Sequence, residues 1–150
     1  MEIRFLGAEE IDKILSAGEV GTMGTIGRDG PYVVALNYLY LNGKIYVHGR
    51  KTGRKMDNLA FDPRVSFLVY EAHGYLRGDS PCSISAVYQS VLVTGRAKEI
   101  EGEAASAVLS RMSEKFSPDL GDFSIPPDKL AITAVLEIEI DLVTGKSLSA

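Results

Sequence analysis

The alternation of apolar and polar positions along this chain predicts β-strands interrupted by a few helices. Residues 132–142 alternate most regularly: even positions carry aliphatic side chains, predicted to face inward, and odd positions carry mostly Thr, Glu or Asp, predicted to face outward. This period of two is typical of a strand with one buried face. Shorter or less regular apolar runs predict further strands at 20–28, 32–41, 44–48, 65–70 and 86–100, the last bent at Gly95.

Apolar residues at helical spacing predict three helices, at 8–17, 54–61 and 101–116. Gly18 follows the first helix, and Pro63 stops the second because the residue before a proline avoids the helical region. Two polar segments rich in Gly or Pro are predicted to lack regular structure, a flexible one at 71–81 and an irregular one at 117–129. The buried stripe of the third helix would be Ala105, Val108, Leu109, Met112 and Phe116.

Two dipeptides predict tight turns, Asp29-Gly30 and Asn42-Gly43, the second as a type I′ hairpin turn. Six strands joined mostly by short turns predict a mainly β (α+β) fold, a six-stranded antiparallel split β-barrel with flanking helices, in one domain over residues 1–150. The strand at 32–41 is apolar on both faces. A barrel wall buries only one of them, so we expect a homodimer to cover the other.

The composition narrows the class of protein without naming a function. With 150 residues, 45% hydrophobic and 24% charged, the chain resembles an ordinary globular protein. A net charge of -4 argues against nucleic acid as a partner, because phosphate backbones are bound by basic surfaces. One cysteine and two histidines exclude a disulfide framework and argue against a metal cluster. Without a membrane-length apolar run or a signal pattern, we expect a cytoplasmic protein that does not bind membranes.

One loop concentrates positive charge in this acidic chain. Residues 49–55 read GRKTGRK, with four cations, two glycines that allow close backbone approach, and a helix N-terminus directly after them. The arrangement suits an anion, although a solvated basic turn would look the same. Cations alone cannot give micromolar affinity, which takes about 8 kcal/mol, since an exposed ion pair contributes about 0–1 kcal/mol. A ligand held here needs an organic part buried on the strands, which favours a nucleotide-like cofactor.

Three blocks of sequence resemble a known family. They read VVALNYLYLNGKIYVHGRKTGRKMDNLAFDPRVSF, CSISAVYQSV followed by VTGRA, and TAV through IEI to TGK. In this order they are similar to the FMN-binding split-barrel proteins related to pyridoxamine 5′-phosphate oxidase, and within them to the nitroimidazole-resistance (Nim) group. The resemblance covers most of the chain from about Val20 onward.

This resemblance implies a homodimer with FMN at the subunit interface. The backbone of Ala35, Leu36, Asn37 and Tyr38 would line the flavin ring, and a second chain would contribute Tyr88, Gln89, Ser90 and Val91. The family usually has a small residue at the position of Arg50 and a charged one at that of Gln89. The remaining cofactor-binding residues, beside the ribityl chain and the phosphate, would be His48, Gly49, Arg50, Gly53, Arg54 and Lys55.

The function implied is an FMN-dependent oxidoreductase that reduces small aromatic or nitro-heterocyclic compounds. His48 is the candidate proton donor, with a structural hydrogen-bonding role as the alternative. Cys82 is expected to be a plain buried thiol, with a place in the substrate pocket as the alternative, and His73 is the weaker histidine candidate. Four other hypotheses stay open: a flavin carrier without turnover, a pyridoxamine 5′-phosphate oxidase, a haem-binding split barrel and a deazaflavin-binding split barrel.

Overall fold

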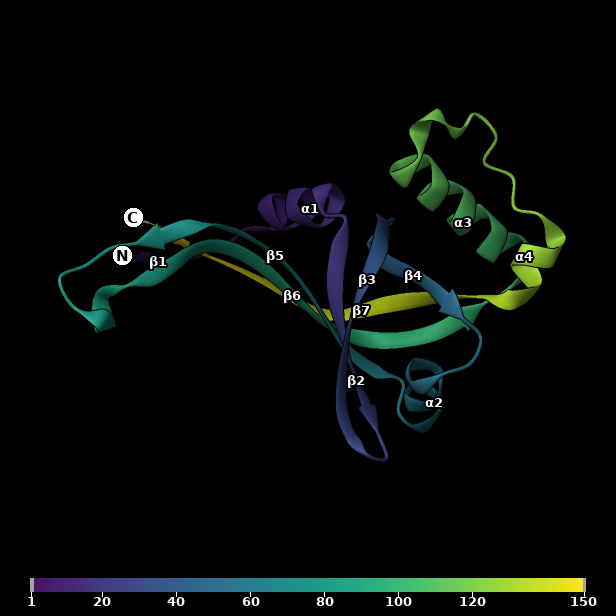
Figure 1. The fold of residues 1–150 in the computed structure, drawn as a ribbon, viewed down its shortest axis with the longest axis horizontal. Helices are drawn as coiled ribbons and strands as arrows, with labels where there is room; N and C mark the ends of the chain where they lie inside the picture. Colours follow the sequence, from purple (N-terminus) through teal and green to yellow (C-terminus); the bar gives the residue numbers. More distant parts are fainter. Residues whose placement is uncertain (1, 150) are drawn as a thin grey trace.

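The computed structural model describes residues 2–149, which form a seven-stranded antiparallel sheet with helices on both sides (Figure 1). Two short 3-10 turns lie at Pro81–Ser83 and Pro118–Leu120. The helices are α1 (Ala8–Ala17), α2 (Arg54–Phe61), α3 (Gly102–Phe116) and α4 (Pro127–Ile132). The strands are β1 (Glu2–Phe5), β2 (Val20–Gly27), β3 (Gly30–Leu41), β4 (Lys44–Arg50), β5 (Arg64–Leu76), β6 (Ser85–Ile100) and β7 (Thr133–Ser149).

Six of these strands close into a ring. Hydrogen-bonded neighbours follow the order β7-β4-β3-β2-β5-β6, and β6 pairs again with β7. The turn at Asn42-Gly43 forms as predicted, with φ 53° and 73°. The first hairpin turns at Arg28-Asp29, one residue earlier than predicted, because Gly30, with φ 112°, already pairs with Gly27. The predicted six-stranded barrel with flanking helices is therefore confirmed. The short strand β1, which pairs with the end of β7, was not predicted, because its four residues are all exposed.

The side chains inside the ring form the main core. Tyr38 and Phe67 are fully buried there and meet edge to face, with ring centroids 5.3 Å apart. A second core lies outside the ring, where α3 covers Leu39, Tyr46 and Val135. Burying one such side chain contributes about 1.5–3 kcal/mol. The predicted stripe of α3 is confirmed for its first four residues, while Phe116 is half-buried.

The predicted facing of β7 was wrong at both ends and in the middle. Val135 and Glu137 were expected to point to solvent, yet both are buried on the face that α3 and Tyr46 share. Ile132 and Leu142 were expected inward and are more than 60% exposed. Ile132 ends α4, and the register opposite Thr94 and Gly95 skips one residue of β7, so the alternation reverses before Leu142.

The expected double burial of residues 32–41 holds only in part within the chain. Leu39 and Leu41 pack against α3 on the outer face, as part of the second core. Val33, Ala35 and Asn37, on the same face but beyond the end of α3, are exposed. Helix α3 of the same chain therefore covers part of the face that was expected to need a partner.

Both segments predicted to lack regular structure contain some. Residues 71–76 continue β5 and pair with β6, so only 77–81 of the predicted flexible segment lies outside the strands, leading into the 3-10 turn. Cys82 in this turn was expected to be buried and is exposed, because no element covers the tip of the hairpin. This hairpin forms an arm that reaches away from the ring, beside both chain termini (Figure 1). An arm exposed on both faces needs no apolar alternation, which is why its polar sequence was misread. Helix α4 likewise lies partly in the segment predicted to be irregular.

Candidate functional site

The barrel wall is open between β3 and β4. These strands pair only from Tyr38↔Val47 to their connecting turn. The residues of β3 before Tyr38 pair only with β2, and the residues of β4 after Val47 pair only with β7, as far as Arg50↔Thr133. In the described part of the chain, no strand pairs with the other edge of residues 30–37. Backbone groups on this edge can therefore meet a ligand.

Helix α2 begins beside this opening. Gly53 precedes it with φ 123°, a conformation that favours glycine, and no side chain caps its first turn. Asn58 anchors the helix to the barrel, because its Nδ2 donates a 3.0 Å hydrogen bond to the Thr25 hydroxyl. A Cβ at Gly27 would collide with the Asn58 side chain, so the helix packs closely here. The free N–H groups of α2 are thus held in a fixed position.

The cations of the basic loop have few acidic partners. Lys51 pairs with Glu99 at 3.7 Å, and the Arg54 guanidinium lies 4.5 Å from the Tyr32 ring centroid. Across residues 2–149, neither Arg50, Arg54 nor Lys55 makes an ion pair with a carboxylate. Arg54 and Lys55 in the first turn of α2, with Arg50 at the end of β4 just before it, create a field that favours a bound anion.

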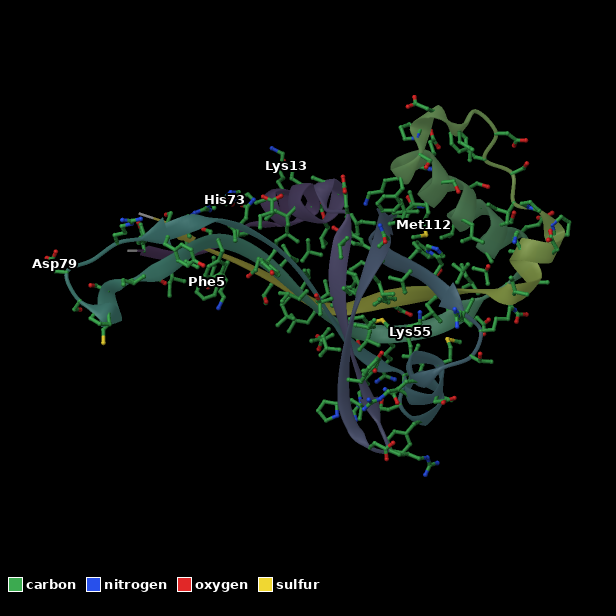
Figure 2. All side chains as sticks on the ribbon, in the orientation of Figure 1. Phe5, Lys13, Lys55, His73, Asp79 and Met112 are labelled. Atoms are coloured by element: carbon green, nitrogen blue, oxygen red, sulfur yellow. The ribbon has the colours of Figure 1, made fainter. Side chains whose placement is uncertain are left out.

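Lys55 is the most confined of these cations. Its side chain is half-buried and extends from α2 toward the strands (Figure 2). The ammonium packs against Gly49, in the space that a Cβ at this position would need. Burial lowers the pKa of Lys55, because the charged form has lost part of its water without gaining a carboxylate. An anion bound nearby would stabilise the charged form and raise the pKa of Lys55 again.

His48 lies on the outer face of β4, one residue past the split. Its imidazole keeps some exposure, but neighbouring groups remove much of its water. This desolvation, and then the charge of Lys55, lower the pKa of His48. The ring is therefore neutral at pH 7 and can donate or accept a hydrogen bond without adding a charge.

The four predicted ring-lining residues of β3 are not equivalent. Ala35 and Asn37 point outward and are exposed, and Leu36 is half-buried toward the interior. The Tyr38 side chain is fully buried, with its hydroxyl donating to the Leu15 carbonyl at 2.6 Å, and burial raises its pKa. The Tyr38 backbone is also engaged. Of these four predicted residues, only Ala35, Leu36 and Asn37 can therefore present side-chain or backbone groups to a ligand outside the barrel.

The predicted contribution from β6 lies where the arm joins the barrel. Val91 is fully buried, and Gln89 donates a 2.9 Å hydrogen bond to Glu71. Tyr88 and Ser90 are half-buried. The structure thus brings residues 35–37, 48–50 and 53–55 together around one opening, whereas residues 88–91 lie where the arm joins the barrel, away from α2 (Figure 1).

One residue near the opening was missed from the sequence. Lys115, in the last turn of α3, donates hydrogen bonds to the carbonyls of Gly18 and Tyr38, the latter at 2.9 Å. Its ammonium also lies 4.6 Å from the Tyr38 ring centroid. Nothing in the spacing links position 115 to positions 18 and 38, so only the fold could show this contact.

Two absences concern the described residues alone. No cluster of three or more His, Cys, Asp or Glu side chains within 2–149 could hold a metal ion. None of the helices in that range is both long and apolar enough to cross a membrane.

Comparison with known proteins identifies the family. The family profile described as pyridoxamine 5′-phosphate oxidase matches residues 7–147. The chain belongs to this family. A curated relative, an uncharacterized protein of Rhizobium meliloti (strain 1021), is 26% identical over 100 residues, which are 67% of this chain and 59% of that protein. The chain therefore spans less than two thirds of that relative's length.

Two solved structures share the fold of this family member. One is a candidate 5-nitroimidazole antibiotic resistance protein from Bacteroides thetaiotaomicron, with a TM-score of 0.79 and 24% identity over 98% of this chain and 92% of that one. The other is an FAD-binding protein from Mesorhizobium loti, with a TM-score of 0.70 and 28% identity over 99% of this chain and all of that one. The superfamily inferred from the sequence is confirmed, and one similar structure carries the name of the resistance group.

Proposed function

We propose that this member of the pyridoxamine 5′-phosphate oxidase family is an FMN-binding oxidoreductase that reduces small aromatic or nitro-heterocyclic compounds. The observation that carries the proposal is the trio of Arg50, at the end of β4, and Arg54 and Lys55, in the uncapped first turn of α2 beside the open edge of β3. Within residues 2–149 none of the three pairs with a carboxylate. The FAD-binding protein from Mesorhizobium loti and the Bacteroides protein named for nitroimidazole resistance support the two parts of this proposal.

The residues at the opening fit a flavin mononucleotide. Arg54, Lys55 and the first N–H groups of α2 would hold the phosphate, which needs donors and positive charge. The exposed strip of β3 around Ala35 offers apolar surface and free backbone groups to the ring, and Val33 beside it is 63% exposed. When bound, the flavin would supply the hydride or electron transfer, which no side chain can perform.

The chain's own residues would bind and orient the reactants. His48, Gly49 and Arg50 lie between the proposed phosphate site and the β3 strip, where the ribityl chain would run. Gly49 leaves space for the Lys55 ammonium, which a larger residue would displace. The neutral His48 imidazole can donate a hydrogen bond to a ligand without charge repulsion from it.

A second copy of the chain is part of the proposal. Tyr88, Gln89 and Ser90 lie where the arm joins the barrel, away from the opening, so in this proposal they reach it from another molecule. Val91, whose side chain is fully buried, would contribute only its backbone. Large apolar side chains are exposed both along the arm and on β3, which favours an interface between copies. They are Val33, Tyr70, Tyr75 and Leu92, with exposed fractions of 63%, 61%, 74% and 45%.

The loop is tested by removing two of its cations together. For Arg54→Ala/Lys55→Ala we expect FMN affinity to fall at least tenfold, about 1.4 kcal/mol, with the oligomeric state unchanged. Fluorescence titration of FMN measures the affinity, and analytical ultracentrifugation measures the mass. A matched control is Lys13→Ala/Lys129→Ala, which removes two exposed cations on α1 and α4. Equal affinity in both variants would make the loop a solvated turn.

The shared site is tested by subunit exchange. A loop variant and a Ser90→Leu variant should each bind FMN weakly alone. If each site combines the loop of one chain with β6 of the other, a mixed dimer has one intact site, and half of its FMN binding returns. No recovery after exchange, with dimers shown by ultracentrifugation, would place each site within a single chain.

FAD is a second candidate cofactor, favoured by one feature of the structure. A pocket of about 560 Å³ lies between the Arg28–Asp29 turn and α2, and Arg54 lines it. A nucleotide longer than FMN could extend from the loop into this space. Competition between FMN and FAD for the apoprotein decides between them.

The rate at which the reduced flavin is reoxidised by an acceptor distinguishes a reductase from a flavin carrier without turnover. The reduced holoprotein is mixed in a stopped-flow instrument with 2-methyl-5-nitroimidazole, a quinone or pyridoxamine phosphate. A reductase accelerates reoxidation above the rate in buffer for at least one acceptor. Equal rates with all three would favour the carrier.

A further inference from the structure

A separate pocket of about 380 Å³ lies under α3, on the outer side of β4. Met112 and Phe116 of α3 form its roof, and the chain after the helix closes it with Leu120 and Ile125. His48 lies in its floor. Figure 2 shows Met112 pointing from α3 toward the sheet. The pocket therefore adjoins the proposed cofactor site through one shared residue, His48.

The lining of this pocket is almost without charge. Among the described residues that line it, His48 is the one ionisable side chain, and none is Asp, Glu, Lys or Arg. Two of its three hydroxyls are already engaged, since Ser113 donates to the Leu109 carbonyl at 2.9 Å and Thr133 to the Lys129 carbonyl at 2.7 Å. A charged ligand would lose its hydration here without an ionic partner, which is costly. The lining favours a neutral ligand with one or two polar atoms.

The size of the pocket limits the ligand further. Sites for small molecules usually span about 300–1,000 Å³, so this one is near the lower limit. It has room for one or two aromatic rings and not for a three-ring flavin with its ribityl phosphate. Phe116 and Met112 offer the aromatic and sulfur contacts that a flat ring prefers.

We propose that the pocket between α3 and β4 binds the small neutral aromatic substrate, with His48 and Ser117 as its hydrogen-bonding groups. This assignment rests on the proposed function, because it makes the pocket the substrate site of the flavin reductase. It also gives His48 a definite place, at the border between cofactor and substrate. Helix α3 and the chain that follows it then determine which substrates enter.

Binding can be measured directly because the chain contains no tryptophan. Leu120 is 61% exposed at the rim, so Leu120→Trp introduces a single fluorophore beside the pocket. We expect 2-methyl-5-nitroimidazole, a neutral nitro compound that quenches indole fluorescence, to give saturable quenching. Asp119→Trp is the matched control, since residue 119 is exposed on the same turn and does not line the pocket. Its quenching should stay weak and linear.

A second substitution blocks the pocket without touching the proposed cofactor site. Ser117→Phe, in the Leu120→Trp background, should weaken probe binding at least tenfold, because the ring fills the space beside Phe116. Asp119→Phe in the same background should change it less than twofold. FMN affinity should stay within twofold in all variants. Saturable quenching that Ser117→Phe leaves unchanged would overturn the assignment.

Charge selectivity gives an independent test. In the Leu120→Trp protein, 4-nitrotoluene should bind at least tenfold more tightly than 4-nitrobenzoate, which has the same shape with a carboxylate. Equal affinities would contradict a neutral pocket. The FMN titration separates the two proposals. Normal FMN binding without saturable probe binding would contradict the assignment of the pocket as a ligand site. Probe binding without FMN binding would support that assignment and contradict the proposed flavin function.

Discussion

Two half-buried lysines, one on each side of the sheet, show different uses of the same side chain. Burial lowers the pKa of both Lys55 and Lys115. Lys115 donates to two backbone carbonyls and lies 4.6 Å and 5.1 Å from the ring centroids of Tyr38 and Phe116. Lys55 has no ion pair anywhere in residues 2–149 and packs against the backbone of Gly49.

The difference separates a structural cation from a binding one. The contacts of Lys115 replace the water that its ammonium loses, so its charge stabilises the fold by joining α3 to the end of α1 and to the last third of β3. The desolvation of Lys55 is not offset within the chain, so its charge can only be stabilised by a ligand. A lowered pKa alone would not distinguish them, whereas their partners do.

Lys115→Met should give the largest change in stability. It removes the donor from the carbonyls of Gly18 and Tyr38, and hydrogen bonds from a charged group contribute about 1.5–3 kcal/mol each. Part of this loss is offset because methionine does not carry the desolvation cost of the buried ammonium. We expect the free energy of unfolding to fall by about 2 kcal/mol, measured by urea denaturation. Lys13→Met, at an exposed position on α1, is the control and should change it by no more than about 0.5 kcal/mol. An equal, small change in both variants would show that Lys115 is not structural.

Lys55→Met should show the opposite pattern. Removing a desolvated charge that has no partner costs the fold nothing, so the free energy of unfolding should stay within about 0.5 kcal/mol or rise. FMN affinity should fall, because the phosphate loses a cation. Urea denaturation and FMN titration on the same preparation measure both quantities. A loss of stability similar to that of Lys115→Met, with unchanged FMN affinity, would reverse the assignment of the two lysines.

Local patterns in the sequence were sufficient for most of the fold. The bounds of α1 and α2 and the turn at Asn42-Gly43 depend on neighbours along the chain, and they formed as predicted. Errors arose where a distant element covers a surface. Val135 and Glu137 were assigned to solvent because nothing in their own strand shows that α3 and Tyr46 lie over them.

The candidate site shows the same division. The basic loop was visible because four cations and two glycines are consecutive in the chain. The split between β3 and β4 could not be predicted, since it depends on which strands pair with each other in the folded sheet. Lys115 and the pocket under α3 were also invisible, because they join segments more than 60 positions apart in the sequence.

His48→Gln should give the smallest effect, a change in how stability depends on pH. The folded pKa of His48 lies below its ordinary value of 6.5, because of desolvation and the charge of Lys55. Between these two values the unfolded chain binds more protons, so the free energy of unfolding falls as the pH drops through this interval. Urea denaturation at pH 7.5 and 5.0 should therefore show a larger loss for the wild type than for the variant. In Lys55→Met the wild-type loss should shrink, since one of the two causes is gone. Identical losses in all three proteins would mean that His48 is not desolvated and that Lys55 does not act on it, which would separate the loop from the pocket under α3.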